Sequence, residues 1–259
     1  MKIIKIKKMP KARYKITFDD GSDLIVYEEI IINHVLLTGK NVDDNLKRKI
    51  ISDNDQALPY HQAINYINTK LRSREEIIAY LLKKGNKEDY VRKAITRLED
   101  EGYINDEVFA KSFVNDKIHL SNDGIYKIRK GLERYKVDSD IIDKVISNVN
   151  DEASNSRIDK LISKQLRLNT KYTGKVLKNN IFNYLMNLGY DKDIILEKLE
   201  DYNFENNINI ENEYNRLYKK YSKKYSGNKL GLVIRHHLFQ RGYDVTDIEN
   251  ITNKKEPLK

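Results

Sequence analysis

The sequence contains no cysteine and no tryptophan, and only three prolines among 259 residues. Without cysteine, neither disulfides nor cysteine-bound metal sites can form, which suits the reducing cytoplasm in which we expect the protein to reside. No apolar run approaches the roughly 18 residues of a membrane-spanning helix. The lysine-rich start, residues 1–8, lacks the apolar block of a signal peptide. We therefore expect a soluble protein without a membrane partner.

Motifs for catalysis and cofactor binding are also missing. Gly39-Lys40 is followed by Asn41, so it lacks the Ser or Thr of a phosphate-binding loop, and neither G-x-G-x-x-G nor H-E-x-x-H occurs. Adjacent helical residues point about 100° apart, which excludes His236 and His237 as an i, i+4 metal pair. We expect no cofactor, no metal and no enzyme activity; a nuclease with dispersed carboxylates is the catalytic alternative.

One acidic cluster, Asp19, Asp20 and Asp23, has two interpretations. The carboxylates could hold a hard cation together with turn carbonyls. They are equally the residues that a hairpin turn around Gly21-Ser22 requires. The turn explains them without a metal, and we prefer it.

What the chain does have is a repeated pattern: Ile, Leu four residues later, Gly or Lys after four more, and Val or Ile after a further six. It recurs four times, at Ile77, Leu81, Gly85 and Val91; Ile128, Leu132, Lys136 and Ile142; Ile181, Leu185, Gly189 and Ile195; Ile234, Leu238, Gly242 and Ile248. The Ile and Leu share one helix face, so burial of this stripe predicts packed helical repeats. Repeats of this size stack on their neighbours because none buries a core alone.

The predicted fold is mainly α, with tandem three-helix-bundle repeats forming an elongated solenoid-like array and a small N-terminal β-hairpin and helix extension. The turn-rich stretch 52–55 marks the end of that extension, and Pro59 is placed near the start of the next helix. The N-terminal helix is expected over 28–38. The expected segments are 1–56 for the extension, 57–103, 104–150, 151–203 and 204–252 for the repeats, and 253–259 for a flexible tail.

Several residues predict helix ends. Ser73 with Glu76 forms a capping box, Asp138 is an N-cap, and Gly85 is a left-handed C-cap. Lys136 replaces the glycine of the other repeats, so we expect that helix to end differently. Gly131 interrupts a helix, which indicates close helix packing or a binding role.

Basic residues outnumber acidic ones by 48 to 39, and the excess is largest in 204–259. Such a surface attracts DNA, RNA or an acidic protein face without choosing among them. Two clusters lie in the first two repeats: Lys70, Arg72, Arg74, Lys83 and Lys84, then Lys127, Arg129, Lys130 and Arg134. Either cluster is a solvated helix face or a binding surface.

A third cluster combines cations with aromatic residues. Its stripe contains Tyr214, Leu217, Tyr218, Tyr221 and Tyr225, and its flanks contain Arg216, Lys219, Lys220, Lys223 and Lys224. Aromatic rings between cations can stack bases and neutralise phosphates. More often such a stripe is core with lysines beside it. We expect core, with Lys219, Lys220, Lys223 and Lys224 as possible DNA-facing residues.

Three runs in the first two repeats are distinctive. They are Ala63-x-x-Tyr66-Ile67 with Leu71-Arg72-Ser73-Arg74-x-Glu76-Ile77-x-x-Tyr80-Leu81; Leu98-x-x-x-Gly102-Tyr103-Ile104-Asn105-Asp106-Glu107-x-Phe109-Ala110; and Gly124-x-x-x-Ile128-x-x-x-Leu132. Together they resemble the RecX family of bacterial RecA regulators. The match is close over 57–150 and weaker in the last two repeats. The extension, from Arg13-Tyr14 to Gly39-Lys40, resembles that of longer members from Gram-positive bacteria.

The resemblance implies a non-enzymatic protein that lies along the groove of the RecA–DNA filament. It would modulate, mostly inhibit, filament growth, strand exchange and the co-protease activity that triggers the SOS response. The partners are then the RecA filament and possibly single- or double-stranded DNA, and we expect a monomer. Candidate partner contacts are Arg72, Arg74, Lys127, Lys130 and Arg134. The alternative is a stand-alone DNA-binding protein with helix-turn-helix-like repeats.

Overall fold

A computed structural model describes residues 1–149, 151–205 and 209–255. The chain divides into two compact units, Met1–Ser112 with Leu132–Ile142 and Phe113–Gly131 with Asp143–Lys259. Each unit is described by itself. The mainly helical fold with a small N-terminal antiparallel sheet is confirmed. None of the described helices is both long and apolar enough to cross a membrane.

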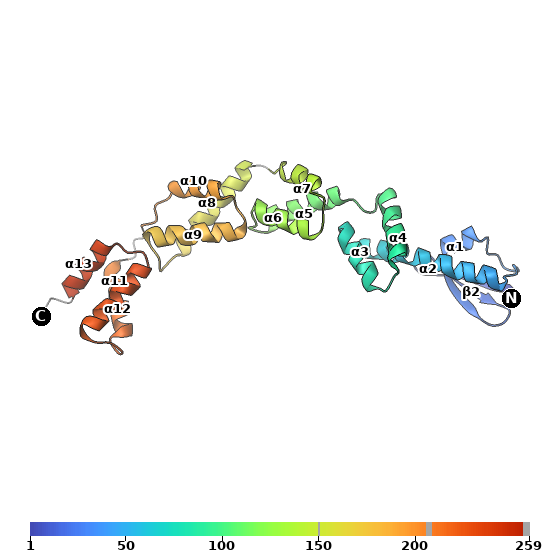
Figure 1. The fold of residues 1–259 in the computed structure, drawn as a ribbon, viewed down its shortest axis with the longest axis horizontal. Coiled ribbons are helices and arrows are strands. Elements are labelled where there is room, and N and C mark those ends of the chain that lie inside the picture. The colour runs from blue at the N-terminus through green and yellow to red at the C-terminus, as the bar shows by residue number, and fades with distance from the viewer. Residues whose placement is uncertain (150, 206–208, 256–259) are drawn as a thin grey trace. The chain divides into compact units, whose positions relative to one another are not determined.

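The N-terminal sheet is a meander of three antiparallel strands, β1 (Ile3–Met9), β2 (Arg13–Phe18) and β3 (Asp23–Tyr27), in the order β1-β2-β3. Period-two alternation buries Ile16 and Phe18 on one face. That face packs with Ile30 and Leu36 of the following segment. The sheet lies along the N-terminal half of the long second helix (Figure 1). Two or three strands alone are marginal in water, so the helix completes their core.

The turn between β2 and β3 uses the acidic residues as hairpin chemistry predicts. Asp20 accepts hydrogen bonds from the amide and hydroxyl of Ser22, which lower the pKa of the Asp20 carboxyl. Asp19 accepts from the amide of Lys2, and Asp23 accepts from the hydroxyl of Thr17. The three carboxylates therefore stabilise the turn and the strand ends beside it.

Two expectations for the extension are wrong. The first helix, α1 (Glu28–Asn33), ends before residue 38 because Val35 adopts a left-handed φ of 46°. The second helix, α2 (Asp44–Ile67), runs through the predicted boundary at 52–55 and contains Pro59. Its polar run is held by tertiary contacts, because Asn54 accepts from the amide of Tyr27 (3.0 Å) and Asp53 contacts His34 (2.8 Å).

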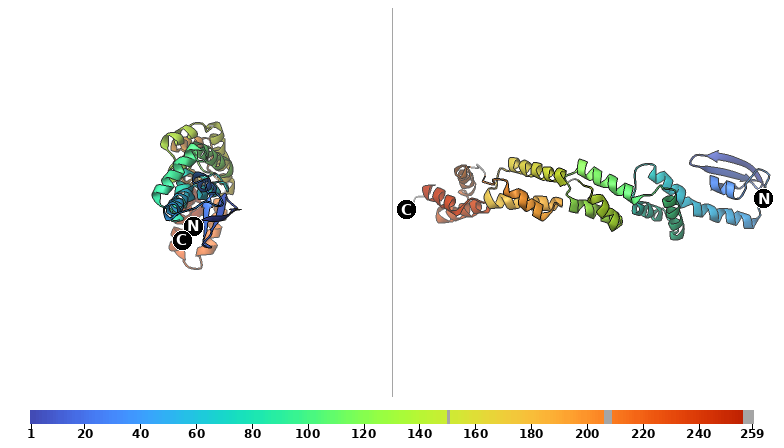
Figure 2. Two further views of the ribbon diagram at one scale, coloured as in Figure 1. Left: turned by 90° about the vertical axis from the view of Figure 1, so that its right-hand side faces the viewer. Right: turned by 90° about the horizontal axis from the view of Figure 1, so that it is seen from above.

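Eleven further helices follow in the described residues. They are α3 (Arg74–Lys83), α4 (Glu88–Asp100), α5 (Asp106–Leu120), α6 (Ile125–Arg134), α7 (Ser139–Ile146), α8 (Asp151–Leu168), α9 (Gly174–Leu188), α10 (Lys192–Glu200), α11 (Ile210–Tyr221), α12 (Gly227–Gln240) and α13 (Val245–Lys255). The helices α2, α3 and α4 pack on one another, as do α8, α9 and α10, and α11, α12 and α13. The last bundle is the red group in Figure 2.

The repeated aliphatic pattern forms the cores of these bundles. All twelve of its Ile, Leu and Val residues are buried, none more than 4% exposed. Fully burying one such side chain contributes roughly 1.5–3 kcal/mol, so the pattern supplies a large share of the packing energy. The prediction that this stripe is structural is confirmed.

The predicted helix caps are also confirmed. Ser73 and Glu76 form a reciprocal capping box, Asp138 accepts from the amide of Asp140 (2.8 Å), and Gly85 has a φ of 82°. The expectation for Lys136 is wrong, because its helix ends in the same way as those that end at a glycine. Lys136 takes the same left-handed conformation (φ 53°), and the next amide bonds back to the Leu carbonyl five residues earlier, as after the three glycines.

Successive repeats meet where the second helix of one begins and the second helix of the next ends. Gly124 donates from its amide to the carbonyl of Leu188 (2.7 Å), and Thr173 donates from its amide to the carbonyl of Arg241 (2.8 Å). In the first unit the equivalent contact is an ion pair between Lys136 and Glu75 (2.6 Å). Two of these joints are therefore made by main chain and one by side chains.

The last helix is longer than predicted. The helix α13 extends to Lys255, which pairs with Glu211 of α11 (2.6 Å). Residues 253–255, which the sequence assigned to the tail, therefore belong to this helix. Residues 256–259 lie outside the described residues.

Candidate partner-binding surface

The two arginines at the start of α3 are engaged within their own unit. The guanidinium of Arg72 lies 4.0 Å from the ring centre of Tyr66 and pairs with Glu76, and its side chain is only 16% exposed. Stacking and ion pairing together hold it in place. Arg74 is about half exposed and pairs with Glu99 through Nε (2.6 Å). Arg74 can exchange this surface partner for an external one, whereas Arg72 is largely committed to the fold.

The amide of Arg74 is also used, because it donates to the carboxylate of Asp106 at the start of α5 (3.0 Å). Burial raises the pKa of Asp106, against the opposing effect of that hydrogen bond and of the Arg74 charge. Sequence reasoning missed this contact between two helix starts. It shows that the N-terminus of α3 is a packing contact in this unit.

The α6 cluster is more accessible. Lys127 pairs with Asp123 (2.7 Å) and remains half exposed. Lys130 and Arg134 are exposed and form no ion pair with the side chains that the structure describes. Arg129, which the sequence places in the same cluster, pairs with Asp143 instead. Among the five predicted contacts, Lys130 and Arg134 are the most available to a partner.

Gly131 on the same helix has a packing role. A Cβ there would lie 2.7 Å from Cζ of Phe113 on α5, well inside normal contact distance. The aromatic ring therefore occupies the space over the glycine. Close helix packing, the first of the two predicted interpretations, accounts for this residue.

The tyrosine stripe of α11 is mostly core, as expected. Tyr214 and Leu217 are buried and Tyr221 packs partly against the same core, but Tyr218 is 45% exposed. The helix ends at Tyr221, so Lys223 and Lys224 lie beyond it rather than on it. Lys219 and Lys220 occupy its last turn.

Sequence reasoning missed a basic cavity beside this helix. Its volume is about 500 Å³, and its lining includes Lys171, Lys220 and Arg241 as well as the rings of Tyr172, Tyr221 and His237. The Tyr221 ring stacks on that of His237, with centres 4.8 Å apart. Arg241 is held by an ion pair with the buried Glu213. The sequence gives little sign of this cavity, because Lys171 and Arg241 lie in different repeats. Its one local signal is the basic Arg241 directly before Gly242.

Comparison with known proteins assigns this architecture. The sequence model of the first three-helix domain of RecX matches residues 60–98, and that of the second matches 105–146. The regulatory protein RecX of Lactococcus lactis is 31% identical over 264 residues, which cover 96% of both chains. The chain belongs to the RecX family. The RecX of Bacillus cytotoxicus is 27% identical over 261 residues, which cover 97% of this chain and 96% of that one.

Two solved RecX structures agree with the fold. One, a regulatory protein RecX, covers 78% of this chain with a TM-score of 0.68 at 23% identity, and all but 1% of its own chain is matched. The RecX of Lactobacillus salivarius covers 58% of this chain with a TM-score of 0.54 at 25% identity, and 99% of its own chain is matched. The named RecX relatives are regulatory proteins. Tandem three-helix domains are thus the family's architecture, and this chain is a RecX-type regulator.

Proposed function

We propose that this RecX-family protein binds the RecA–DNA filament in its groove and modulates, mostly inhibits, filament growth, strand exchange and SOS co-protease activity. The observation that carries the proposal is membership of a family of regulators over almost the whole chain. It acts through protein contact rather than catalysis, as a cytoplasmic monomer without a cofactor. Tandem helical repeats present long surfaces, which suit a polymeric partner.

The partner contacts centre on Lys130 and Arg134, with Lys127 and Arg74 beside them. Lys130 and Arg134 are exposed cations without an ion-pair partner among the described side chains, so binding an acidic surface costs them no internal contact. Lys127 and Arg74 must each exchange one surface ion pair, which is worth about 0–1 kcal/mol. Arg72 contributes mainly by fixing the start of α3.

The test is a RecA strand-exchange assay with purified proteins. Charge reversal in Lys130→Glu with Arg134→Glu should raise the protein concentration for half-maximal inhibition by about tenfold or more. Lys5→Glu with Lys7→Glu on β1 makes the same change in net charge at exposed positions and is the control. Circular dichroism should show unchanged helix content in both. Wild-type protein without effect at stoichiometric RecA would refute the proposal, and equal activity of both double variants would remove these contacts from it.

A second function, direct binding of DNA, is favoured by the basic cavity at Lys171, Lys220 and Arg241. Its cations could neutralise a phosphate while the Tyr221 ring stacks on a base. Lys219, Lys223 and Lys224, close to Lys220 in the sequence, would add positive charge. A salt titration of oligonucleotide binding without RecA tests it. A slope near −6 or steeper indicates many phosphate contacts and supports direct binding, whereas weak, nearly salt-independent binding refutes it.

A further inference from the structure

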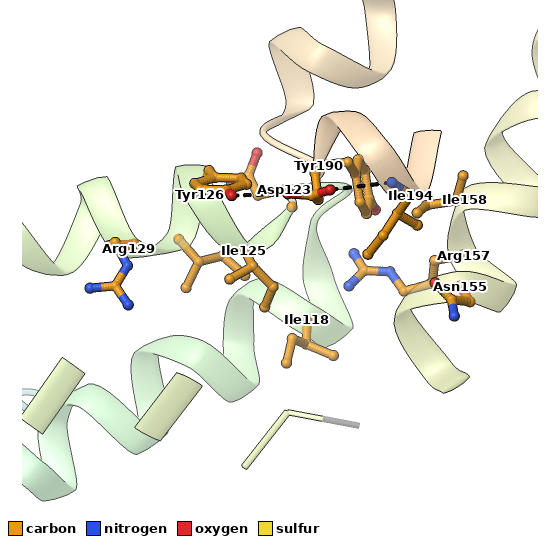
Figure 3. Close-up of a pocket in the computed structure, with 13 residues that line it drawn as sticks. Ile118, Asp123, Ile125, Tyr126, Arg129, Asn155, Arg157, Ile158, Tyr190 and Ile194 are labelled. Atoms are coloured by element: carbon orange, nitrogen blue, oxygen red, sulfur yellow. Dashed lines mark hydrogen bonds between the residues drawn. The ribbon is translucent and has the colours of Figure 1, made fainter. Parts of the chain in front are cut away.

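A second cavity, of about 470 Å³, lies within the unit formed by Phe113–Gly131 and Asp143–Lys259 (Figure 3). It opens where α5 and α6 meet α8 and the loop between α9 and α10. Its apolar walls are isoleucines from four helices: Ile118, Ile125, Ile128, Ile158 and Ile194. The volume is within the 300–1,000 Å³ range of sites that bind small molecules or side chains.

Main-chain contacts join the start of α6 to the loop between α9 and α10 in the cavity wall. The amide of Gly124 donates to the carbonyl of Leu188 (2.7 Å), and the amide of Tyr126 donates to the carbonyl of Gly189 (3.0 Å). A Cβ on Gly124 would lie 2.4 Å from the carbonyl oxygen of Gly189. These contacts place Tyr190 and Asp191 beside Gly124 and Tyr126 in that wall.

The carboxylates that line the cavity are already neutralised or hydrogen-bonded. Asp123 pairs with Lys127 (2.7 Å) and Lys117 (3.0 Å). Although burial acts in the opposite direction, these two ammonium groups lower the pKa of Asp123. Asp191 caps α10 and accepts from the hydroxyl of Tyr126 (2.9 Å). Neither carboxylate is therefore left to attract a cationic ligand.

Two hydrogen-bond donors in the cavity have capacity for a ligand. Arg157 donates only to the carbonyl of Ser121 and pairs with no carboxylate among the side chains that the structure describes. The hydroxyl of Tyr190, a residue only 6% exposed, has no hydrogen-bond partner in the described part of the chain. Tyr190 and Arg157 lie side by side (Figure 3), and the Arg157 charge opposes the burial that raises the pKa of Tyr190. An unpaired guanidinium beside an unpartnered hydroxyl is suited to a ligand oxygen that carries negative charge.

We propose, on the basis of the regulatory function proposed above, that this cavity binds an acidic side chain flanked by an aliphatic residue of a partner protein. The ligand carboxylate accepts hydrogen bonds from Arg157 and from the Tyr190 hydroxyl. The aliphatic neighbour packs against Ile118, Ile125 and Ile158. A nucleic-acid phosphate fits less well, because the isoleucine walls would contact a hydrated sugar–phosphate backbone.

The probe is the blocked peptide acetyl-Ala-Leu-Glu-Leu-Ala-amide, with a second peptide that carries Gln in place of Glu. Binding is followed by NMR of isoleucine methyl groups and of the Arg157 Nε–H in the full-length protein. The Glu peptide should shift the cavity isoleucines saturably, and the Gln peptide should bind about tenfold more weakly or worse, the loss expected for a charge-assisted hydrogen bond.

The decisive variant is Arg157→Met, which keeps most of the aliphatic stem and removes the charge. It should lose the Glu-over-Gln preference, and Tyr190→Phe should reduce it. Arg167→Met, at an exposed position of the same helix, is the matched control and should bind as the wild type does. Preserved isoleucine methyl dispersion shows that each variant is folded.

Three results would overturn the proposal: no methyl shifts with the Glu peptide, equal affinity for both peptides, or the same shifts produced by a thymidine dodecanucleotide in place of the peptide. Because RecA is absent from this assay, the outcome is separate from that of the strand-exchange test. Peptide binding without any effect on RecA would refute the proposed function and support this site. If the protein regulates RecA but does not bind the peptide, the proposed function is supported and this site is refuted.

Discussion

The glycine directly after the C-cap of α12 allows a sharp test of how the repeats are joined. Gly242 is left-handed (φ 94°), and a Cβ there would lie 2.1 Å from the carbonyl oxygen of Thr173. Gly85 is left-handed too (φ 82°), but nothing lies within 4 Å of its Cβ position. Alanine at either position costs roughly 1–2 kcal/mol for the left-handed backbone. Only Gly242→Ala also forces the joint apart.

The additional cost follows from the contact that must open. The amide of Thr173 donates to the carbonyl of Arg241 (2.8 Å), and Thr173 is 7% exposed. Losing that bond in a buried place costs about 1–3 kcal/mol more. We therefore expect Gly242→Ala to destabilise the protein by about 2–5 kcal/mol and Gly85→Ala by about 1–2 kcal/mol.

Two measurements check this expectation. Urea titration gives the free energies of unfolding, and amide hydrogen exchange reports whether the Thr173 N–H is still protected. Gly242→Ala should lower that protection, whereas Gly85→Ala should leave it unchanged. If the two variants lose equal stability and Thr173 stays protected in both, the main-chain contact between these repeats does not require glycine at position 242, and the reasoning is refuted.

Three other changes follow from the same contacts. Lys136→Gly should stabilise the protein by about 0.5–1 kcal/mol in urea, because glycine tolerates the left-handed C-cap; Glu75→Gln, which removes the ion-pair partner, is the control, and a loss of stability would contradict the reasoning. Gly131→Ala should destabilise by about 1 kcal/mol through its contact with Phe113, and a double-mutant cycle with Phe113→Leu should abolish that cost. Burial, together with a hydrogen bond to a glutamate, raises the pKa of Tyr60 to about 12, so Tyr60 adds stability below pH 10 that is lost between pH 10 and 12; Tyr60→Phe should flatten thermal stability over that window, and an unchanged slope would refute the shift.

The repeat pattern predicted the core well because its spacing is a direct consequence of helix geometry. Ile77 and Leu81 are four residues apart, so a helix must place them on one face. The same holds for Ile181 and Leu185. Local chemistry was equally informative at Ser73, where the capping box depends only on residues three apart.

Both wrong predictions for the N-terminal extension depended on contacts distant in sequence. The polar stretch 52–55 is typical of a turn. In the structure, however, Asn54 accepts a hydrogen bond from the amide of Tyr27 at the end of β3, and Asp53 contacts His34. Those contacts satisfy the polar groups on a continuous helix, so the local preference for a turn is overridden. The early end of α1 at Asn33 has the same origin, because Leu36 must turn back into the core beneath the sheet.

The candidate binding residues were the hardest to rank from sequence. Arg72 and Lys130 are both basic residues on or beside a repeat's second helix, so residue type alone does not separate them. In the structure Arg72 lies over Tyr66 and pairs with Glu76, while Lys130 is exposed. A basic residue four positions before a glutamate is often used internally, and that signal is present at Arg72.

The joints explain why one repeat dispenses with the glycine that the others retain. Two separate reasons require glycine at Gly189 and at Gly242. The backbone is left-handed, and a Cβ would lie 2.6 Å or less from a main-chain atom. At Lys136 only the left-handed backbone applies. The contact with α3 is made there by the Lys136 ammonium group, which pairs with Glu75. Lysine pays the modest left-handed cost and gains a side-chain contact. Loss of glycine therefore marks the joint where side chains, rather than main chain, connect consecutive repeats.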